Sequence, residues 1–161
     1  MTFTMDDVNV LYEDNHILVV VKPQNMPVMA DESKDLDLLT LLKNWLKEKY
    51  NKEGEAYLGL VHRLDRPTGG IMVFAKTSKA AERLCQAIKD REVEKNYLAV
   101  IGGKLKSEKG TLTNWLKKNP NTNTVYIATS LTEGAKKAEL DYTQLETLGT
   151  ISLVKVQLKT G

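Results

Sequence analysis

The chain has 161 residues, a mass of 18.1 kDa, 42% hydrophobic and 27% charged residues, a composition that predicts one globular domain, residues 1–161, with enough apolar material for a core. No apolar run approaches the roughly 20 residues of a membrane-spanning helix. The single cysteine, Cys85, excludes an internal disulfide, and the first residues lack the pattern of a secretory signal, so we expect a cytoplasmic protein.

The charge is unevenly distributed along the chain. Residues 1–60 carry 6 Lys and Arg against 11 Asp and Glu, whereas residues 61–161 carry 17 against 10. A local excess of positive charge attracts polyanions such as RNA, although many proteins that bind no nucleic acid show a similar imbalance. The second part of the chain is therefore the better candidate for contact with RNA.

Short apolar and β-branched runs predict a protein rich in strands. Residues 13–16 contain an Asp-Asn pair that favours a tight turn, and Gly149 marks a second turn, so each is expected to close a hairpin. Pro23 ends the second strand because proline has no amide hydrogen to donate. The expected strands are residues 8–12, 17–21, 57–61, 71–75, 97–101, 110–116, 124–128, 138–145 and 151–158.

Two segments show helical spacing of apolar residues. The first begins at Asp35, the expected N-cap, has an apolar stripe from Leu36 to Leu46 and ends near Tyr50. The second is capped at residues 77–78, ends near residue 90 and is expected to bury Cys85 on its apolar side. Together these elements predict an α+β fold with a mixed, largely antiparallel sheet and flanking helices.

A dense polar segment, residues 62–70, lies between two predicted strands and contains one proline and two glycines. Such a segment forms a loop, and loops on a rigid sheet often display reactive groups. Asp65 has Arg63 and Arg66 beside it, and cations favour an ionised carboxylate suited to nucleophilic or base chemistry. A structural salt bridge of Asp65 with these arginines is the alternative that charge alone favours.

The same loop and two other segments resemble one known family. Residues 62–77, which read HRLDRPTGGIMVFAKT, resemble the catalytic motif of the RluA-type RNA pseudouridine synthases. Residues 17–28 resemble the family's upstream segment, and residues 95–102, KNYLAVIG, resemble its later "K-YLA-V-G" segment. The three matches occur in the family's order and are spread over residues 17–102, and the last strands resemble those that lead to its final motif.

The resemblance implies an enzyme that isomerises specific uridines of rRNA or tRNA to pseudouridine, with RNA as partner and without a cofactor or metal. It implies that Asp65 is catalytic, either attacking the nucleotide or removing a ribose proton. Arg63 is implied to contact phosphate or to fill the space of the extruded nucleotide, with orientation of Asp65 as its alternative. Tyr97 is implied to pack on the base, the alternative being a tyrosine of the core. His62 is expected to brace the loop by hydrogen bonding.

The chain departs from the family pattern in two places. Gly69 stands where the motif often has serine, a change that the loop is expected to tolerate. The chain ends at residues 160–161, where the family continues into further strands and a basic residue, so we expect a truncated form with little or no activity alone. A non-catalytic RNA-binding protein of this fold, and an unrelated hydrolase that uses Asp65 with His62, are the alternatives. The oligomeric state does not follow from the sequence.

Overall fold

The computed structural model describes residues 3–122 and 124–160, and the chain divides into two compact units, Met1–Glu92 and Val93–Gly161. In the described residues, the strands form a four-stranded and a five-stranded sheet in which every strand pair is antiparallel. The predicted α+β class with largely antiparallel pairing is therefore confirmed, with the strands divided between two sheets. The single domain, residues 1–161, stays a prediction.

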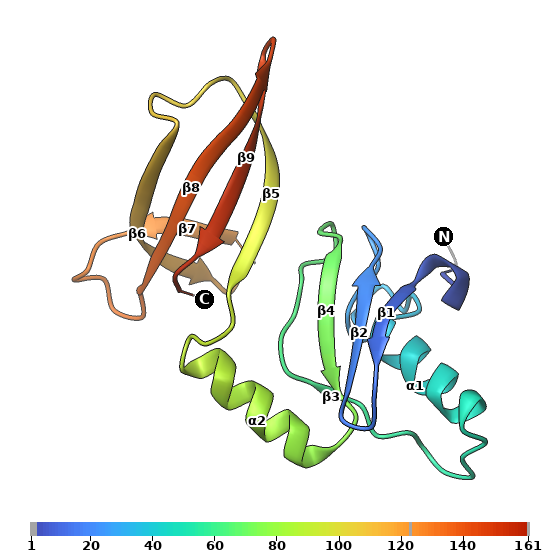
Figure 1. Ribbon diagram of the computed structural model, residues 1–161. Coiled ribbons are helices and arrows are strands. Elements are labelled where there is room, and N and C mark those ends of the chain that lie inside the picture. The colour runs from blue at the N-terminus through green and yellow to red at the C-terminus, as the bar shows by residue number, and fades with distance from the viewer. Residues whose placement is uncertain (1–2, 123, 161) are drawn as a thin grey trace. The chain divides into compact units, whose positions relative to one another are not determined.

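The first unit contains the four-stranded sheet, whose strand order is β1-β2-β4-β3 (Figure 1). The predicted hairpin of β1 and β2 is confirmed, and its turn is fixed by the Asp14 carboxylate, which accepts hydrogen bonds from the backbone of His16 and Ile17, both at 2.7 Å. β4 pairs with β2 along its whole length but with β3 at only two residues. The strands are β1 (Asn9–Glu13), β2 (Ile17–Lys22), β3 (Gly59–Leu60) and β4 (Gly70–Ala75).

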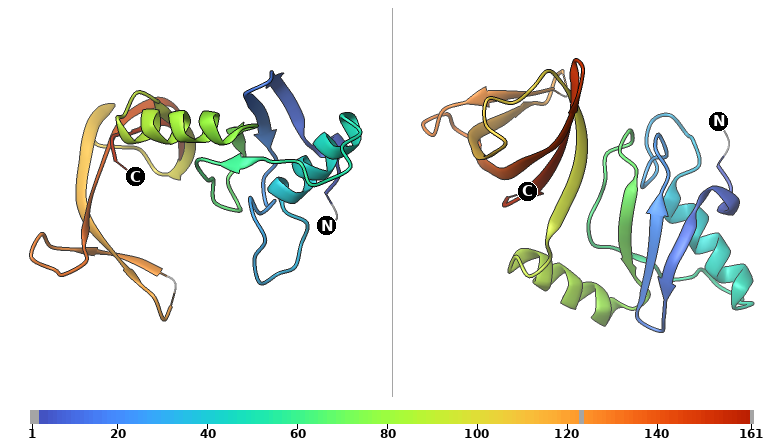
Figure 2. Two further views of the ribbon diagram at one scale, coloured as in Figure 1. Left: turned by 90° about the horizontal axis from the view of Figure 1, so that it is seen from below. Right: turned by 45° about the horizontal axis from the view of Figure 1, so that its top comes forward.

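Helix α1 (Leu38–Lys49) lies against one face of β1 and β2 (Figure 2) and completes the core of this unit. Its buried residues, Leu38, Leu42 and Leu46, recur every four positions and confirm the predicted stripe. The N-cap is Asp37, whose side chain accepts from the backbone of Thr40 at 2.9 Å, so the prediction of Asp35 as N-cap is wrong by two residues. The core also contains Leu18, Val20, Met26, Met72 and Phe74.

Helix α2 (Ser78–Lys89) follows β4 and contacts β3 and β4. Its N-cap is Thr77, whose hydroxyl accepts from the backbone of Ala80 at 3.1 Å, and the predicted bounds are confirmed. Of the α2 residues, all of which are described, only Ala80 is buried. Cys85 is exposed, so the expectation that it is buried is wrong. The physical reason is that α2 buries only one residue, so most of its apolar side stays accessible to solvent.

The second unit is the five-stranded sheet, with strand order β5-β9-β8-β6-β7 and a strong twist (Figure 2). The predicted hairpin of its last two strands is confirmed, and Gly149 occupies the turn with φ 59°, a conformation that favours glycine. β6 and β8 are longer than predicted because their pairing continues through polar residues. The strands are β5 (Lys95–Gly102), β6 (Lys109–Asn119), β7 (Thr124–Ala128), β8 (Lys136–Leu148) and β9 (Ile151–Leu158).

Candidate active site

The polar loop between β3 and β4, residues 61–69, leaves the sheet at the end of β4 that is paired with Lys22 of β2. The loop enters β4 through Gly70, whose φ of 149° is a backbone conformation that residues with a side chain rarely adopt. Arg63 and Asp65 both lie on this loop, so the structure brings these two predicted site residues together on one segment of the first unit.

The loop is anchored by a buried lysine that was not predicted as a site residue. Lys22 is fully buried, and its ammonium group donates to the carbonyl oxygens of Met26 at 2.7 Å, Pro23 at 3.0 Å and Arg66 at 3.1 Å. Burial lowers the pKa of Lys22, the charge of Arg66 lowers it further, and Asp65 opposes both effects. An ammonium group has three hydrogens, and here each has a backbone acceptor.

A signal for Lys22 exists in the sequence. The side chains of β2 alternate between half-buried and buried, and Leu18, Val20 and Lys22 occupy the buried positions. A lysine at an inward position of a strand has to find partners inside the protein, because an unpaired buried charge is strongly unfavourable. The alternation therefore indicates a functional or structural role for Lys22.

Arg66, on the other side of Asp65 from Arg63, binds a second loop. Its guanidinium group donates to Ser33 Oγ at 2.9 Å and forms ion pairs with Asp35 and, at 3.4 Å, with Asp31. The hydrogen bond to Asp35 is the largest cause that raises the pKa of Arg66, and the same contact lowers the pKa of Asp35. The guanidinium group of Arg66 is thus bound by residues 31–35.

Asp65 is exposed, and among the described residues its carboxylate forms no hydrogen bond or ion pair. Only its backbone takes part in the turn, where its carbonyl oxygen accepts from the backbone of Thr68 at 3.0 Å. The alternative in which Asp65 is the partner of a structural salt bridge is therefore wrong, since Arg66 pairs with other carboxylates. The loop presents a carboxylate that a ligand can approach directly.

Arg63 and His62, which precede Asp65 in the same motif, have different surroundings. Arg63 is exposed, and its Nη1 lies 3.9 Å from Met29 Sδ, a weak contact that leaves the guanidinium group available to an anion. His62 Nε2 accepts a hydrogen bond from the backbone of Val73 at 3.0 Å. Because β3 ends before it reaches Val73, the imidazole takes the place of a strand partner, which confirms that His62 braces the loop.

Tyr97, the third predicted site residue, belongs to the second unit. It lies on β5 opposite Val156 of β9, and its side chain is half-buried, so the ring is not enclosed in a core. The structure therefore places Tyr97 on strand β5 of the second unit, whereas Asp65 and Arg63 belong to the first unit. Its role stays a prediction.

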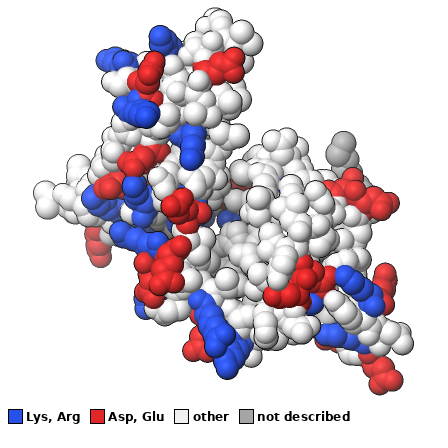
Figure 3. Space-filling view, viewed as in Figure 1, with Lys and Arg blue, Asp and Glu red and all other residues white. Residues whose placement is uncertain are grey.

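The surface charges of the second unit are mixed. Lys137 pairs with Glu139 at 2.7 Å and Lys159 with Asp141 at 2.8 Å, and on the face drawn in Figure 3 blue and red side chains alternate. The positive excess of residues 61–161 is thus partly neutralised locally. In the described part of the chain, no three His, Cys, Asp or Glu side chains are grouped in a way that could hold a metal ion, and no helix is long and apolar enough to cross a membrane.

Comparison with known families identifies the class of protein that this loop and fold define. The sequence model of the RNA pseudouridylate synthase family matches residues 16–161, nearly the whole chain. The protein belongs to this family. The resemblance inferred from the motifs is therefore confirmed.

Two curated bacterial relatives carry the name ribosomal large subunit pseudouridine synthase D. The one from Borreliella burgdorferi is 30% identical over 157 residues, which cover 94% of this chain and 47% of the relative. The one from Xanthomonas campestris is 31% identical over 153 residues, which cover 95% of this chain and 44% of the relative. The chain thus spans about half the length of these relatives.

Two solved human structures share the fold. The RNA pseudouridylate synthase domain containing 4 protein matches with a TM-score of 0.79 and 24% identity, over 95% of this chain and 59% of the human chain. The human RNA pseudouridylate synthase domain containing 1 protein matches with a TM-score of 0.77 and 24% identity, over 100% of this chain and 63% of the human chain. At this level of identity the likeness concerns the fold.

Proposed function

We propose that the protein is an RNA pseudouridine synthase that isomerises specific uridines of rRNA or tRNA, with Asp65 as its catalytic residue. The observation that carries the proposal is the exposed, unpaired carboxylate of Asp65 on a loop that the buried Lys22 holds in place. Membership of the family and the names of the bacterial relatives, which specify the large ribosomal subunit, support RNA as the substrate.

The reaction breaks the bond between the uracil nitrogen and the ribose and forms a bond from a ring carbon to the same ribose carbon. The ring carbon loses a proton and the ring nitrogen gains one, so no oxidant or reductant takes part. Asp65 either attacks the nucleotide or removes a ribose proton, and both routes require an ionised, accessible carboxylate. The detached uracil has to be confined while it turns, which demands a rigid site.

Arg63 and Tyr97 are proposed to bind the nucleotide. The guanidinium group of Arg63 is exposed and its planar donors suit a phosphate, whereas Tyr97 offers a ring on which a base can stack. Stacking on an aromatic side chain contributes about 1–3 kcal/mol per base in proteins that bind single strands. These residues would hold the extruded uridine for Asp65.

The test is a pseudouridine assay on rRNA and tRNA from the source cell, with residues 1–161 and with the complete reading frame that contains them. Asp65→Ala and Asp65→Asn are expected to abolish product while RNA binding persists. Glu82→Gln, which alters an exposed carboxylate of α2, is the matched control and should keep wild-type activity. Product formation by Asp65→Ala would overturn the role of Asp65, and RNA binding without product in every form would favour a non-catalytic RNA-binding protein.

A further inference from the structure

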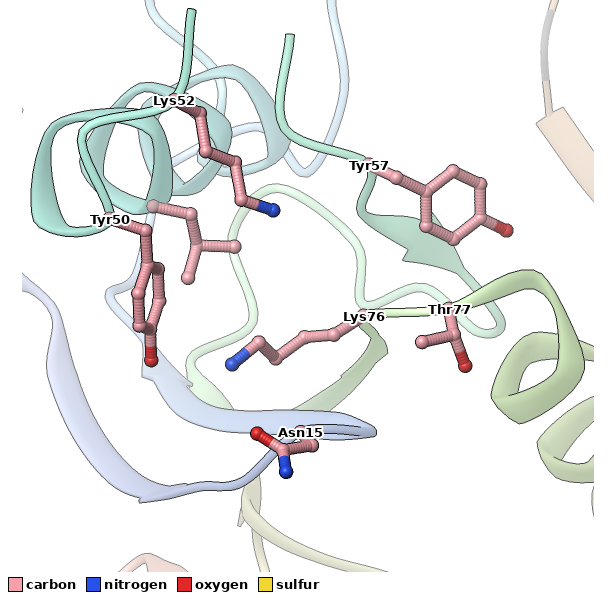
Figure 4. Close-up of a pocket in the computed structure, with 7 residues that line it drawn as sticks. Asn15, Tyr50, Lys52, Tyr57, Lys76 and Thr77 are labelled. Carbon is pink, nitrogen blue, oxygen red and sulfur yellow. The ribbon is translucent and has the colours of Figure 1, made fainter. Parts of the chain in front are cut away.

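The first unit contains an open cavity of about 320 Å³ (Figure 4). No residue of the Asp65 loop, residues 61–69, lines it. It lies between the turn of β1 and β2, the end of α1 and the start of α2. The described residues that line the cavity include no acidic residue. The lining residues are Asn15, Leu46, Tyr50, Lys52, Tyr57, Lys76 and Thr77.

The cavity carries excess positive charge. The Glu13 carboxylate beside it accepts from Lys76 at 2.7 Å and also pairs with Lys49, so one negative charge already faces two ammonium groups. Lys52 adds a third positive charge. It is exposed, it forms no ion pair with any described residue, and its amino group extends into the space beside Tyr50 and Lys76 (Figure 4). An anion that enters the cavity therefore meets an unneutralised cation.

Two half-exposed tyrosines line the same cavity. Tyr50 is 48% and Tyr57 is 49% exposed. The hydroxyl of Tyr50 donates to Glu13 at 2.6 Å and the Lys76 ammonium lies 5.0 Å from its ring centre, so the ring is held before any ligand arrives. Proteins that bind single-stranded nucleic acids combine aromatic rings, on which bases stack, with positively charged side chains that follow the phosphates.

The position of the cavity separates it from the proposed catalytic site. Asp65 precedes β4 at the Gly70 end, whereas Lys76 and Thr77 follow β4 at the Ala75 end. At about 3.4 Å per residue, β4 keeps the two places roughly 17 Å apart. One nucleotide therefore cannot occupy both.

We propose that this cavity binds a second nucleotide of the substrate RNA, away from the target uridine, with Lys52 on its phosphate and Tyr57 against its base. The proposal rests on the proposed function for the identity of the polyanion. It assigns to the first unit, which is acidic in its first 60 residues, a local RNA contact that the distribution of charge along the sequence does not suggest.

The test measures the affinity of the protein for substrate rRNA or tRNA at several salt concentrations. Each lysine–phosphate contact contributes about 0.7 to 0.9 to the slope of log affinity against log salt, so Lys52→Ala should reduce the slope by nearly 1. Tyr57→Ala should weaken binding about 5-fold or more with the slope unchanged. Lys47→Ala removes an exposed lysine of α1 that does not line the cavity, and it should behave as wild type.

Pseudouridine formation is measured on the same preparations. Wild-type product together with a normal salt slope for Lys52→Ala would overturn the second contact and leave the proposed function intact. A reduced slope for Lys52→Ala without product from the wild-type protein would support the RNA contact while the catalytic proposal fails. Equal losses in Lys52→Ala and Lys47→Ala would also overturn the site, because they would indicate a diffuse charge effect.

Discussion

The ammonium nitrogen of Lys22 lies 3.1 Å from the carbonyl oxygen of Arg66, and this hydrogen bond joins two segments that are 44 residues apart in the sequence. Lys22 ends a core strand, and Arg66 directly follows the proposed catalytic residue. Because Lys22 is fully buried and also binds the backbone at Pro23 and Met26, it fixes the loop relative to the core. The position of Asp65 therefore depends on a residue from the first hairpin.

Removal of this anchor should destabilise the protein. Lys22→Met keeps an unbranched side chain but leaves carbonyl oxygens without their charged donor, and we expect the free energy of unfolding to fall by about 2–4 kcal/mol. Denaturant unfolding of the variant measures this loss. Lys47→Met, at an exposed position of α1, should change it by less than about 0.5 kcal/mol. Equal effects of the two substitutions would contradict the anchoring role.

The pairing of Arg66 with Asp35 predicts a change in titration. Arg66→Gln removes the main cause that lowers the pKa of Asp35, so this pKa should rise towards its ordinary value. NMR titration of the Asp35 carboxyl group in both proteins measures the shift. The pKa of Asp14, which is lowered chiefly by backbone hydrogen bonds from Ile17 and His16, should stay constant and serves as the control. An unchanged pKa of Asp35 in Arg66→Gln would mean that the ion pair of Arg66 and Asp35 does not persist in solution.

Glu13 predicts a loss of stability in acid. Burial by itself raises the pKa of Glu13, but hydrogen bonds from Lys49, Lys76 and Tyr50 outweigh it and lower the pKa from 4.5 to about 2. The folded protein thus binds this proton less readily than the unfolded chain, so the stabilisation is present above pH 4.5 and is lost as the pH falls to about 2. A difference of this size corresponds to about 3 kcal/mol.

The measurement is the free energy of unfolding against pH for the wild-type protein and Glu13→Gln. The wild-type protein should be more stable at pH 7, and the difference should shrink between pH 4.5 and 2. Glu82→Gln, at an exposed position of α2, should follow the wild-type curve. A difference that is constant with pH would show that the Glu13 cluster contributes nothing through its charge.

Two adjacent glycines at the junction of the loop and β4 should differ in their response to a side chain. Gly70 has φ 149°, so Gly70→Ala should cost about 1–3 kcal/mol in backbone strain, although its added carbon meets only Leu64 at 3.6 Å. At Gly69 the added carbon would lie 3.0 Å from the flexible side chain of Gln24 and 3.3 Å from the backbone oxygen of Lys22. These contacts require a small local shift, but Gly69 has no positive φ, so Gly69→Ser should cost less than Gly70→Ala. Thermal unfolding compares the two variants, and a larger loss for Gly69→Ser would reverse this assignment.

Local patterns in the sequence were sufficient to predict most of the secondary structure. The stripe that includes Leu38, Leu42 and Leu46 and the turns at residues 13–16 and at Gly149 depend on neighbours within a few positions, which is why periodicity and turn chemistry identify them. The predicted start of α1 was two residues too early because Asp35 and Asp37 are both suitable N-caps. In the structure Asp37 caps the helix, and Asp35 pairs with the distant residue Arg66.

The sequence also determined the family, and with it the loop that carries Arg63 and Asp65, because those motifs are contiguous in the chain. Only the tertiary structure decided which charges meet. Arg66 pairs with residues about 30 positions away instead of with its neighbour Asp65, and one of the three acceptors of Lys22 is 44 residues away. Such partners are brought together where separate loops meet at one end of the paired strands β2 and β4, and no local pattern encodes that choice.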